Sequence, residues 1–196
     1  MRLDLLVPRF PLRSLPPMLA IAALGALFAS LYGILHDQLT YTLSPEYFTK
    51  LKFQQFAWAD FGWPRRIFVA EIGLLASWWV GLIGGWFLAR AGAADLPPHI
   101  RRPYVARSFA LVALVTLTAG MIGWLYGTVA ASSTSLSAWQ IACHSLGVRD
   151  LPHFVIVAHI HNATYLGAAL GILIAIFYIH HVRVGSLWRS ISTGSS

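Results

Sequence analysis

Four long apolar stretches separated by polar segments dominate the chain. They run over residues 18–35, 67–89, 108–131 and 154–179. A helix needs about 20 mainly apolar residues to cross roughly 30 Å of hydrocarbon, and in lipid it must satisfy its own backbone polar groups. The pattern therefore predicts an all-α integral membrane protein, a single domain built as a bundle of four transmembrane helices.

The first apolar stretch is also compatible with a secretory signal, because Arg2, Arg9 and Arg13 precede it. Its apolar run is longer than the roughly 7 to 15 residues of a signal-peptide core. The residues that follow, His36-Asp37-Gln38, do not form a small-residue cleavage site. We therefore expect the stretch to be retained as a helix.

The composition supports a membrane location. Apolar residues make up 57% of the chain and charged residues 11%, against roughly 25% charged residues in soluble domains. The net charge of +7 comes mainly from residues at the ends of apolar stretches, so it indicates membrane topology and anionic lipid headgroups rather than nucleic acid. The single cysteine, Cys143, excludes an intrachain disulfide.

The distribution of basic residues predicts the orientation. Most of the 14 Lys and Arg residues lie at the N-terminus, in the second loop and in the C-terminal tail, residues 182–196. Because cytoplasmic loops carry the excess of positive charge, we expect both termini in the cytoplasm and the first and third loops outside. The protein is then a multi-pass membrane protein with both ends on the cytoplasmic side.

Each apolar stretch carries small residues at four-residue spacing. These are Ala22, Ala26 and Ser30; Gly81 and Gly85; Gly123 and Gly127; and Gly167 and Gly171. In lipid, such stripes allow helix backbones to approach closely and gain van der Waals contact. We expect a compact bundle.

The first outer loop, residues 36–66, contains the signal for a short helix. Ser44 is a good N-cap, Pro45 suits the first helical position, and Glu46 complements the positive helix N-terminus. The aromatic residues that follow alternate with polar ones, which predicts an amphipathic segment in the interface, with Lys50 and Lys52 extending toward the headgroups.

Titratable side chains from three helices are expected in one outer-leaflet layer. Together His36, Asp37, Glu71 and His159 form a ligand set suited to Zn, Fe or Mn, with a coordination position open for water. A haem held between His159 and either His36 or His153 is a further alternative.

A buried hydrogen-bonded network is the alternative to a metal site. His159 and Asn162 are three residues apart and share a helix face, whereas His161 is rotated about 200° from His159. Only one of the two histidines can therefore face the bundle centre, and the one that does so alongside Asn162 is His159. Polar residues of this region would then fix the helix register through hydrogen bonds. They are His153, His161, Asn162 and Tyr165.

The polar motifs resemble those of a group of uncharacterised bacterial multi-pass membrane proteins. The resemblance rests on His36-Asp37-Gln38, Thr40-Tyr41-Thr42 and Ser44-Pro45-Glu46-Tyr47-Phe48-Thr49-Lys50, together with His159-Ile160-His161-Asn162. It implies a bacterial inner membrane, and it carries over no catalytic residue.

Three functions are compatible with the sequence. The first is a non-catalytic membrane subunit or accessory protein, which would contact lipids, other membrane subunits or further copies of itself. The second is a small membrane-embedded metal-dependent enzyme, a hydrolase or an oxidoreductase, that uses the outer-leaflet cluster. The third is a haem-binding membrane subunit.

Overall fold

Four long helices make up most of the protein. The computed structural model describes residues 11–132 and 136–193, and these contain helices and connecting turns but no strand. The long helices are α1 (Leu15–Leu43), α4 (Arg65–Arg90), α5 (Pro98–Ala131) and α7 (Leu151–Thr193). Each contains a segment long and apolar enough to cross a membrane, which confirms the predicted all-α architecture of four spans.

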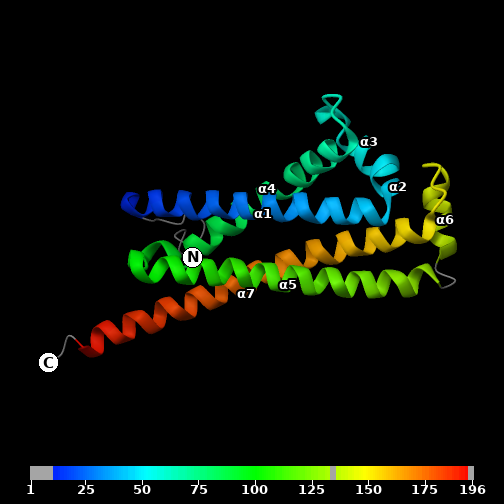
Figure 1. Ribbon diagram of the computed structural model, residues 1–196. Helices are drawn as coiled ribbons and strands as arrows, with labels where there is room; N and C mark the ends of the chain where they lie inside the picture. Colours follow the sequence, from blue (N-terminus) through cyan, green and yellow to red (C-terminus); the bar gives the residue numbers. More distant parts are fainter. Residues whose placement is uncertain (1–10, 133–135, 194–196) are drawn as a thin grey trace, which may run out of the picture.

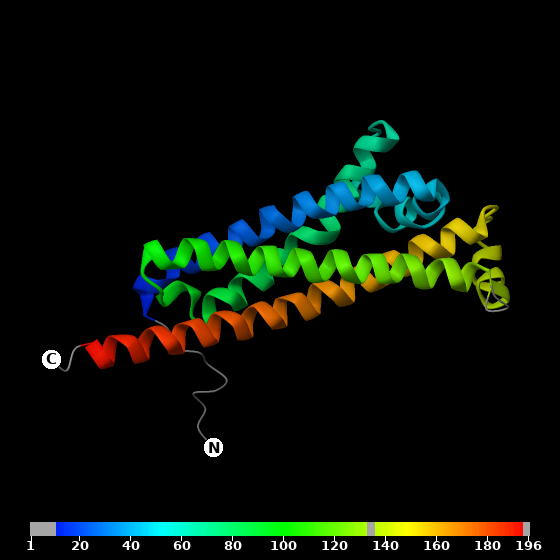
Figure 2. The same cartoon turned by 60° about the horizontal axis from the view of Figure 1, so that its bottom comes forward.

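The helices are arranged as two antiparallel pairs, α1 with α4 and α5 with α7. Contacts between the two pairs are sparse, and we call this boundary the seam. The beginnings of α1 and α5 lie at one end of the molecule, together with the end of α4 (Figure 1). The short helices α2, α3 and α6 lie at the other end, which we call the loop end (Figures 1 and 2).

The α1–α4 pair is held by direct backbone contact. Gly25 packs against Gly81, and Gly33 packs against Gly73, so closely that a Cβ atom on any of the four would overlap the facing backbone. This contact confirms that the small residues of the second span form a packing surface. On α1 the contacting stripe is Ala22, Gly25, Ala29 and Gly33 rather than the expected Ala22, Ala26 and Ser30. The Ser30 hydroxyl instead donates to the Ala26 carbonyl of its own helix.

The α5–α7 pair uses the same kind of contact. A Cβ atom on Gly127 would lie 2.9 Å from Cα of Ile156, and one on Gly123 would lie 2.7 Å from the His159 carbonyl oxygen. Gly171 approaches Val112 of α5 in the same way. Small residues therefore hold both pairs together, as the four-residue spacing predicts.

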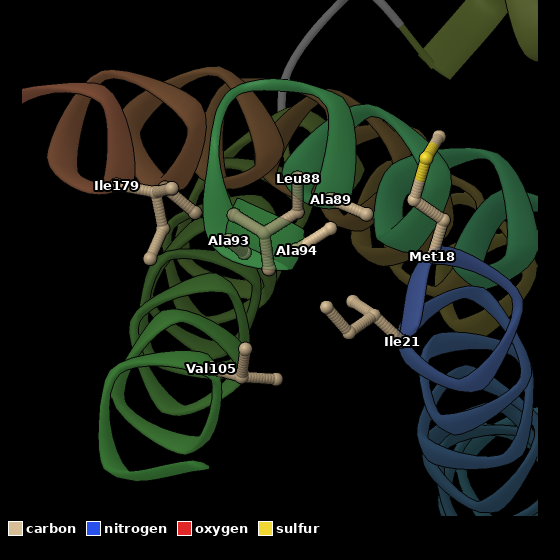
Figure 3. Close-up of a cluster of buried hydrophobic side chains, with 9 residues drawn as sticks. Met18, Ile21, Leu88, Ala89, Ala93, Ala94, Val105 and Ile179 are labelled. Carbon is tan, nitrogen blue, oxygen red and sulfur yellow. The ribbon is translucent and has the colours of Figure 1, made fainter. Parts of the chain in front are cut away.

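A buried apolar cluster joins all four helices at the end opposite the loop end. Figure 3 shows its side chains converging from α1, α4, α5 and α7 and from the short η5 helix (Ala93–Asp95). Its buried members are Met18, Ile21, Leu88, Ala89, Ala93, Ala94, Val105, Ala175 and Ile179. The pairs are thus packed firmly together here.

The first loop is shorter than expected and is helical over most of its length. Helix α1 continues through the His36-Asp37-Gln38 motif to Leu43. After Ser44 come α2 (Pro45–Tyr47), the π-helical turn η3 (Phe48–Lys52), α3 (Phe53–Gln55) and η4 (Ala57–Ala59). As predicted, Ser44 is the N-cap, with its hydroxyl accepting from the Tyr47 N–H, and Pro45 holds the first helical position.

Two other segments are more helical than expected, because helices form beyond the edges of the apolar runs. In the third loop, Leu136–His144 forms helix α6, which the apolar pattern of the chain does not predict. Helix α7 continues to Thr193, so residues 182–193 of the expected polar tail extend the last helix. Residues 194–196 lie outside the described part of the chain.

Candidate functional site

A buried pair of titratable side chains, Asp37 and His161, bridges the seam near the loop end. Asp37 is the next step of the α1 stripe after Gly33, four residues on, so its side chain points toward the other helices. Its Oδ1 lies 3.2 Å from Nε2 of His161 on α7. The two residues are only 5% and 2% exposed.

The hydrogen bonds of His161 show that the Asp37–His161 pair needs a positive charge between its two side chains. Its Nδ1 lies 3.0 Å from the carbonyl oxygen of Val157. A carbonyl can only accept, so Nδ1 carries a proton, and in a neutral imidazole Nε2 is then an acceptor. Nε2 therefore faces a second acceptor, the carboxylate of Asp37. A buried pair of acceptors needs a positive charge, either a proton or a metal ion, to be stable.

His36 completes a three-residue group. Its ring lies edge-on to the His161 ring, with centroids 4.8 Å apart, and stacks on Tyr32 at 5.6 Å. Its Nε2 is buried without a hydrogen-bond partner in the described part of the chain. Each of His36, Asp37 and His161 places one ligand-type atom within 4.8 Å of the other two. We call this group the HDH cluster.

The short helices of the first loop form a lid over the HDH cluster. The ring of Tyr47 lies 4.7 Å from that of His161, and Phe48, which is fully buried, lies at 6.0 Å. Lys52 is buried with its Nζ 5.8 Å from the centre of the Tyr47 ring, so the expected extension of Lys52 into the interface is wrong. The lid packs inward because its aromatic side chains find an apolar surface on α1 and α7.

The environment of the lid shifts two pKa values. Burial lowers the pKa of the Lys52 ammonium, and the nearby Asp37 carboxylate partly opposes this effect. Burial raises the pKa of the Tyr47 hydroxyl, and Tyr165 and Asp37 add to the increase. Both groups are therefore driven toward their neutral forms.

An apolar cavity of about 120 Å³ lies in the seam beside the HDH cluster. All four long helices contribute to its walls, mainly through glycine, alanine and other apolar residues, and its polar lining includes His36, Asp37, His161 and Thr164. Phe28 of α1 and Phe109 of α5 also line it and stack across the seam, with ring centroids 5.8 Å apart. The HDH cluster is thus the main titratable part of an otherwise apolar chamber.

Gln38 and Thr42, which follow His36 and Asp37 on α1, form hydrogen bonds with the start of helix α4. The Gln38 side-chain amide donates to the Arg66 carbonyl at 2.7 Å. The Arg66 guanidinium donates to Gln38 and Thr42 and lies over the Tyr41 ring, 4.8 Å from its centre. These contacts fix the end of α1, and with it the height of His36 and Asp37, relative to α4.

Glu46 lies in the first turn of α2, as expected, and also has a second role. Its carboxylate accepts hydrogen bonds from the backbone N–H groups of Arg149 and Asp150, at 2.8 and 2.7 Å. It therefore joins the lid to the residues just before α7 rather than only complementing its own helix. Lys50 also reaches this loop, because its Nζ would lie 3.8 Å from a Cβ on Gly147.

Two residues of the expected metal set lie outside the HDH cluster. His159 packs edge-on against the rings of Tyr126 and Trp139, at 4.9 and 5.7 Å. Glu71 is half-buried on α4, and its Oε2 has no hydrogen-bond partner among the described residues. The histidine that faces the centre is His161, and the expectation that it is His159 is wrong.

The expected polar network is only partly assembled. Asn162 is exposed, and His153 lies at the exposed start of α7, where Nδ1 is 2.9 Å from the Asp150 carboxylate. Tyr165 lines the cavity, with its ring 6.4 Å from that of His161. Of the four residues proposed for this network, His161 and Tyr165 are therefore at the site.

The correct histidine follows once the face of α7 that packs against α5 is known. His159 lies four residues before Ala163 and eight before Gly167, and Ala163 and Gly167 form the stripe that packs against α5. At 100° per residue, His161 is rotated about 200° from His159 and so points away from that contact. The phase of the small-residue stripe therefore selects His161 for the seam.

The arrangement fits a small ion better than a haem. The expected haem ligand His159 packs against Tyr126 and Trp139 and does not face His36, and His153 pairs with Asp150 at the exposed start of α7. The His36 and His161 rings, with centroids 4.8 Å apart, are too close for a macrocycle to lie between them. A single transition-metal ion needs only the three converging ligand atoms.

Comparison with known proteins gives no match from which a function could be inferred. No protein-family model, curated protein or solved structure matches the chain. The HDH cluster, its lid and the adjoining cavity are therefore the features from which we infer what the protein does.

Proposed function

We propose that the protein is a small membrane-embedded enzyme that depends on a divalent transition metal bound by His36, Asp37 and His161. The observation that supports this most directly is the convergence of three ligand-type atoms to within 4.8 Å in a buried position. Ligand atoms bound to one ion at about 2.0 to 2.2 Å in tetrahedral geometry lie about 3.4 Å apart. Asp37 Oδ1 and His161 Nε2 already have this spacing, at 3.2 Å, so binding requires only an approach of about 1 Å by the remaining ligand atom.

The surroundings of His161 also suit a metal ligand. Metal-binding histidines usually donate their second ring N–H to a carbonyl or carboxylate, and His161 donates Nδ1–H to Val157. Two histidines and one carboxylate leave coordination positions open for water or substrate. The set is compatible with Zn, Fe or Mn, and so with hydrolysis or with oxidation.

The cavity indicates the substrate class. Its walls are almost wholly apolar, and Phe28, which lines it, is 41% exposed on the lipid side of α1. A substrate that reaches the HDH cluster through the seam therefore comes from the hydrocarbon phase. We propose a small apolar molecule or the apolar part of a lipid.

Metal content and Asp37→Asn test this function. In Asp37→Asn the amide can still donate a hydrogen bond to Nε2 of His161, but it is a poor metal ligand. We expect wild-type protein, purified in detergent and supplied with Zn, Fe or Mn, to hold one metal ion per chain. Asp37→Asn and His161→Ala should lose the ion, whereas the control His159→Ala should keep it.

Two results would contradict the proposal. One is wild-type protein with no stoichiometric metal under any of the three supplies. The other is equal metal content in wild type and in correctly folded Asp37→Asn. A proton shared by Asp37 and His161 would then account for the buried pair.

A non-catalytic role as a membrane subunit is the second candidate, favoured by exposed aromatic residues at the loop end. Trp58, Phe61 and Trp63 are 73%, 72% and 54% exposed. Such side chains suit the headgroup layer or a partner protein. Native mass measurement in mild detergent tests this role, because replacing all three by Ala should release a bound partner or second copy.

We also propose that the protein lies in a bacterial inner membrane with both termini in the cytoplasm. The described arginines at the end opposite the loop end outnumber the acidic residues there, as the positive-inside rule requires of a cytoplasmic face. Thiol labelling of single cysteines at positions 61 and 99, in a variant without Cys143, tests the orientation. We expect position 61 to react from outside the cell.

A further inference from the structure

A basic hollow lies at the end of the bundle opposite the loop end, far from the HDH cluster. It has a volume of about 740 Å³. Four arginines line it, each from a different helix: Arg13 of η2 (Leu12–Ser14), Arg90 at the end of α4, Arg101 of α5 and Arg183 of α7. We call it the arginine pocket.

Arginines outnumber carboxylates in the described lining of the arginine pocket. Among the described residues Asp95 is the one lining carboxylate, and it pairs with Arg183 at 3.0 Å. The Arg101 guanidinium donates to the Ala94 carbonyl at 3.3 Å, a neutral acceptor that leaves its charge uncompensated. Arg13 and Arg101, which form no ion pair with a described residue, make the concave surface basic, and such a surface favours an anion with several acceptor oxygens.

An apolar groove continues from the arginine pocket along the outside of the bundle between α1 and α5. The pocket and the groove share Pro17 and Arg101 as lining residues. Along α1 the groove is lined by apolar side chains from Pro17 to Leu31, which spans about 21 Å at 1.5 Å per residue. This length exceeds the roughly 15 Å depth of one leaflet.

We propose that the arginine pocket and the groove together bind one anionic phospholipid. The phosphate lies among the arginines, where guanidinium groups can form paired hydrogen bonds with its oxygens. One acyl chain lies in the groove. A zwitterionic lipid binds less well, because its own ammonium group is repelled by the same arginines. The arginine pocket lies at the opposite end of the bundle from the HDH cluster, and the groove reaches the cavity at Phe28 and Phe109, which line both.

Lipid-dependent thermal stability of the full chain in detergent tests this site. Phosphatidylglycerol should raise the Tm of the wild type in a saturable way, because a ligand that binds only the folded state stabilises it. Phosphatidylcholine and inorganic phosphate should each have a much smaller effect. In Arg101→Gln the apparent affinity for phosphatidylglycerol should fall about tenfold, as expected for loss of one charge-assisted contact.

The control variant is Arg65→Gln, an exposed arginine at the loop end, which should respond to phosphatidylglycerol as the wild type does. Equal stabilisation of the wild type by phosphatidylcholine and phosphatidylglycerol would overturn the proposal, as would an equal loss of response in both variants. Stabilisation by inorganic phosphate alone would assign the pocket to a free anion instead of a lipid. If Arg101→Gln does not fold, native mass spectrometry of wild-type protein in an equimolar mixture of the two lipids decides, because the proposal requires retention of phosphatidylglycerol.

Discussion

The interiors of the two helix pairs are closely packed and apolar, whereas the seam between them contains a cavity and buried polar side chains. Within a pair, glycines bring backbones into contact, as Gly25 and Gly81 do, and no polar group is needed. Across the seam, the middle of the molecule holds a cavity, an aromatic stack and the HDH cluster. The chain is most closely packed inside the helix pairs and most loosely packed in the seam, where titratable groups meet.

This difference explains how a chain of 196 residues can carry buried charge in a membrane. Polar side chains in lipid are costly unless they face a partner or a cavity. The pairs are stable through van der Waals contact, so the seam does not have to supply all of the packing. It can therefore contain Asp37 and His161 and still be closed at both ends by apolar clusters.

A substitution that opens the seam at the loop end should lower the stability of the protein most. Phe48→Ala removes a fully buried ring that packs beside His161. We expect a loss of about 3 to 5 kcal/mol in the free energy of unfolding, because the lid cannot fill the resulting space. Thermal unfolding in detergent measures the loss, with Phe61→Ala as the exposed control. Equal Tm values for the two variants would show that the lid does not close the seam.

Replacing two nearby glycines by alanine compares how tightly the pair interior and the seam are packed. In Gly81→Ala the new methyl group meets the Gly25 backbone, whereas in Gly84→Ala it meets the end of the flexible Ile172 side chain at 2.8 Å. We expect Gly81→Ala to cost about 1 to 3 kcal/mol and Gly84→Ala clearly less. A larger decrease in Tm for Gly84→Ala would reverse our assignment of tight and loose regions.

Removing the hydrogen bonds between the lid and the residues before α7 should lower the stability less. Glu46→Ala removes two charge-assisted hydrogen bonds to the backbone of Arg149 and Asp150. Since these groups are partly exposed, we expect a loss of about 1 kcal/mol and faster amide exchange at both positions. Glu46→Gln keeps an acceptor oxygen and should lose less. Unchanged exchange in Glu46→Ala would contradict this role.

The pH dependence associated with Lys52 should be the smallest effect. Burial lowers the pKa of Lys52 below its ordinary 10.5, so the folded state releases this proton at a lower pH than the unfolded state does. The cost of the buried ammonium is therefore present at neutral pH, and stability rises as the pH increases from the folded pKa toward 10.5. Tm values between pH 7 and pH 10 should rise for wild type relative to Lys52→Met. Parallel curves would place the ammonium in water.

The fold was predictable because its main signals are local. Four apolar stretches of sufficient length predict four spans, and Gly123 and Gly127 mark a packing surface without reference to any partner. The N-cap at Ser44 followed from three adjacent residues. Helix ends were less well predicted, since α1 and α7 continue past their apolar runs.

The candidate site was only half predictable because it depends on how α7 is rotated. His36 and Asp37 stood out as titratable residues at the end of an apolar run, but the choice between His159 and His161 requires knowing which face of α7 meets α5. Lys52 was misplaced for a related reason. Nothing in its own segment shows that Tyr47 and Phe48 fold back over the helices and take the lysine with them.

The Glu46 bond has a mechanical consequence. The two helix pairs are joined covalently through the segment between α4 and α5, at the end opposite the loop end, and Glu46 links them again at the far end. This arrangement is a hinge with a latch. Release of this carboxylate from the two amide groups would remove one link across the loop end, and the buried lid rings together with the Asp37–His161 contact would then have to keep the chamber closed.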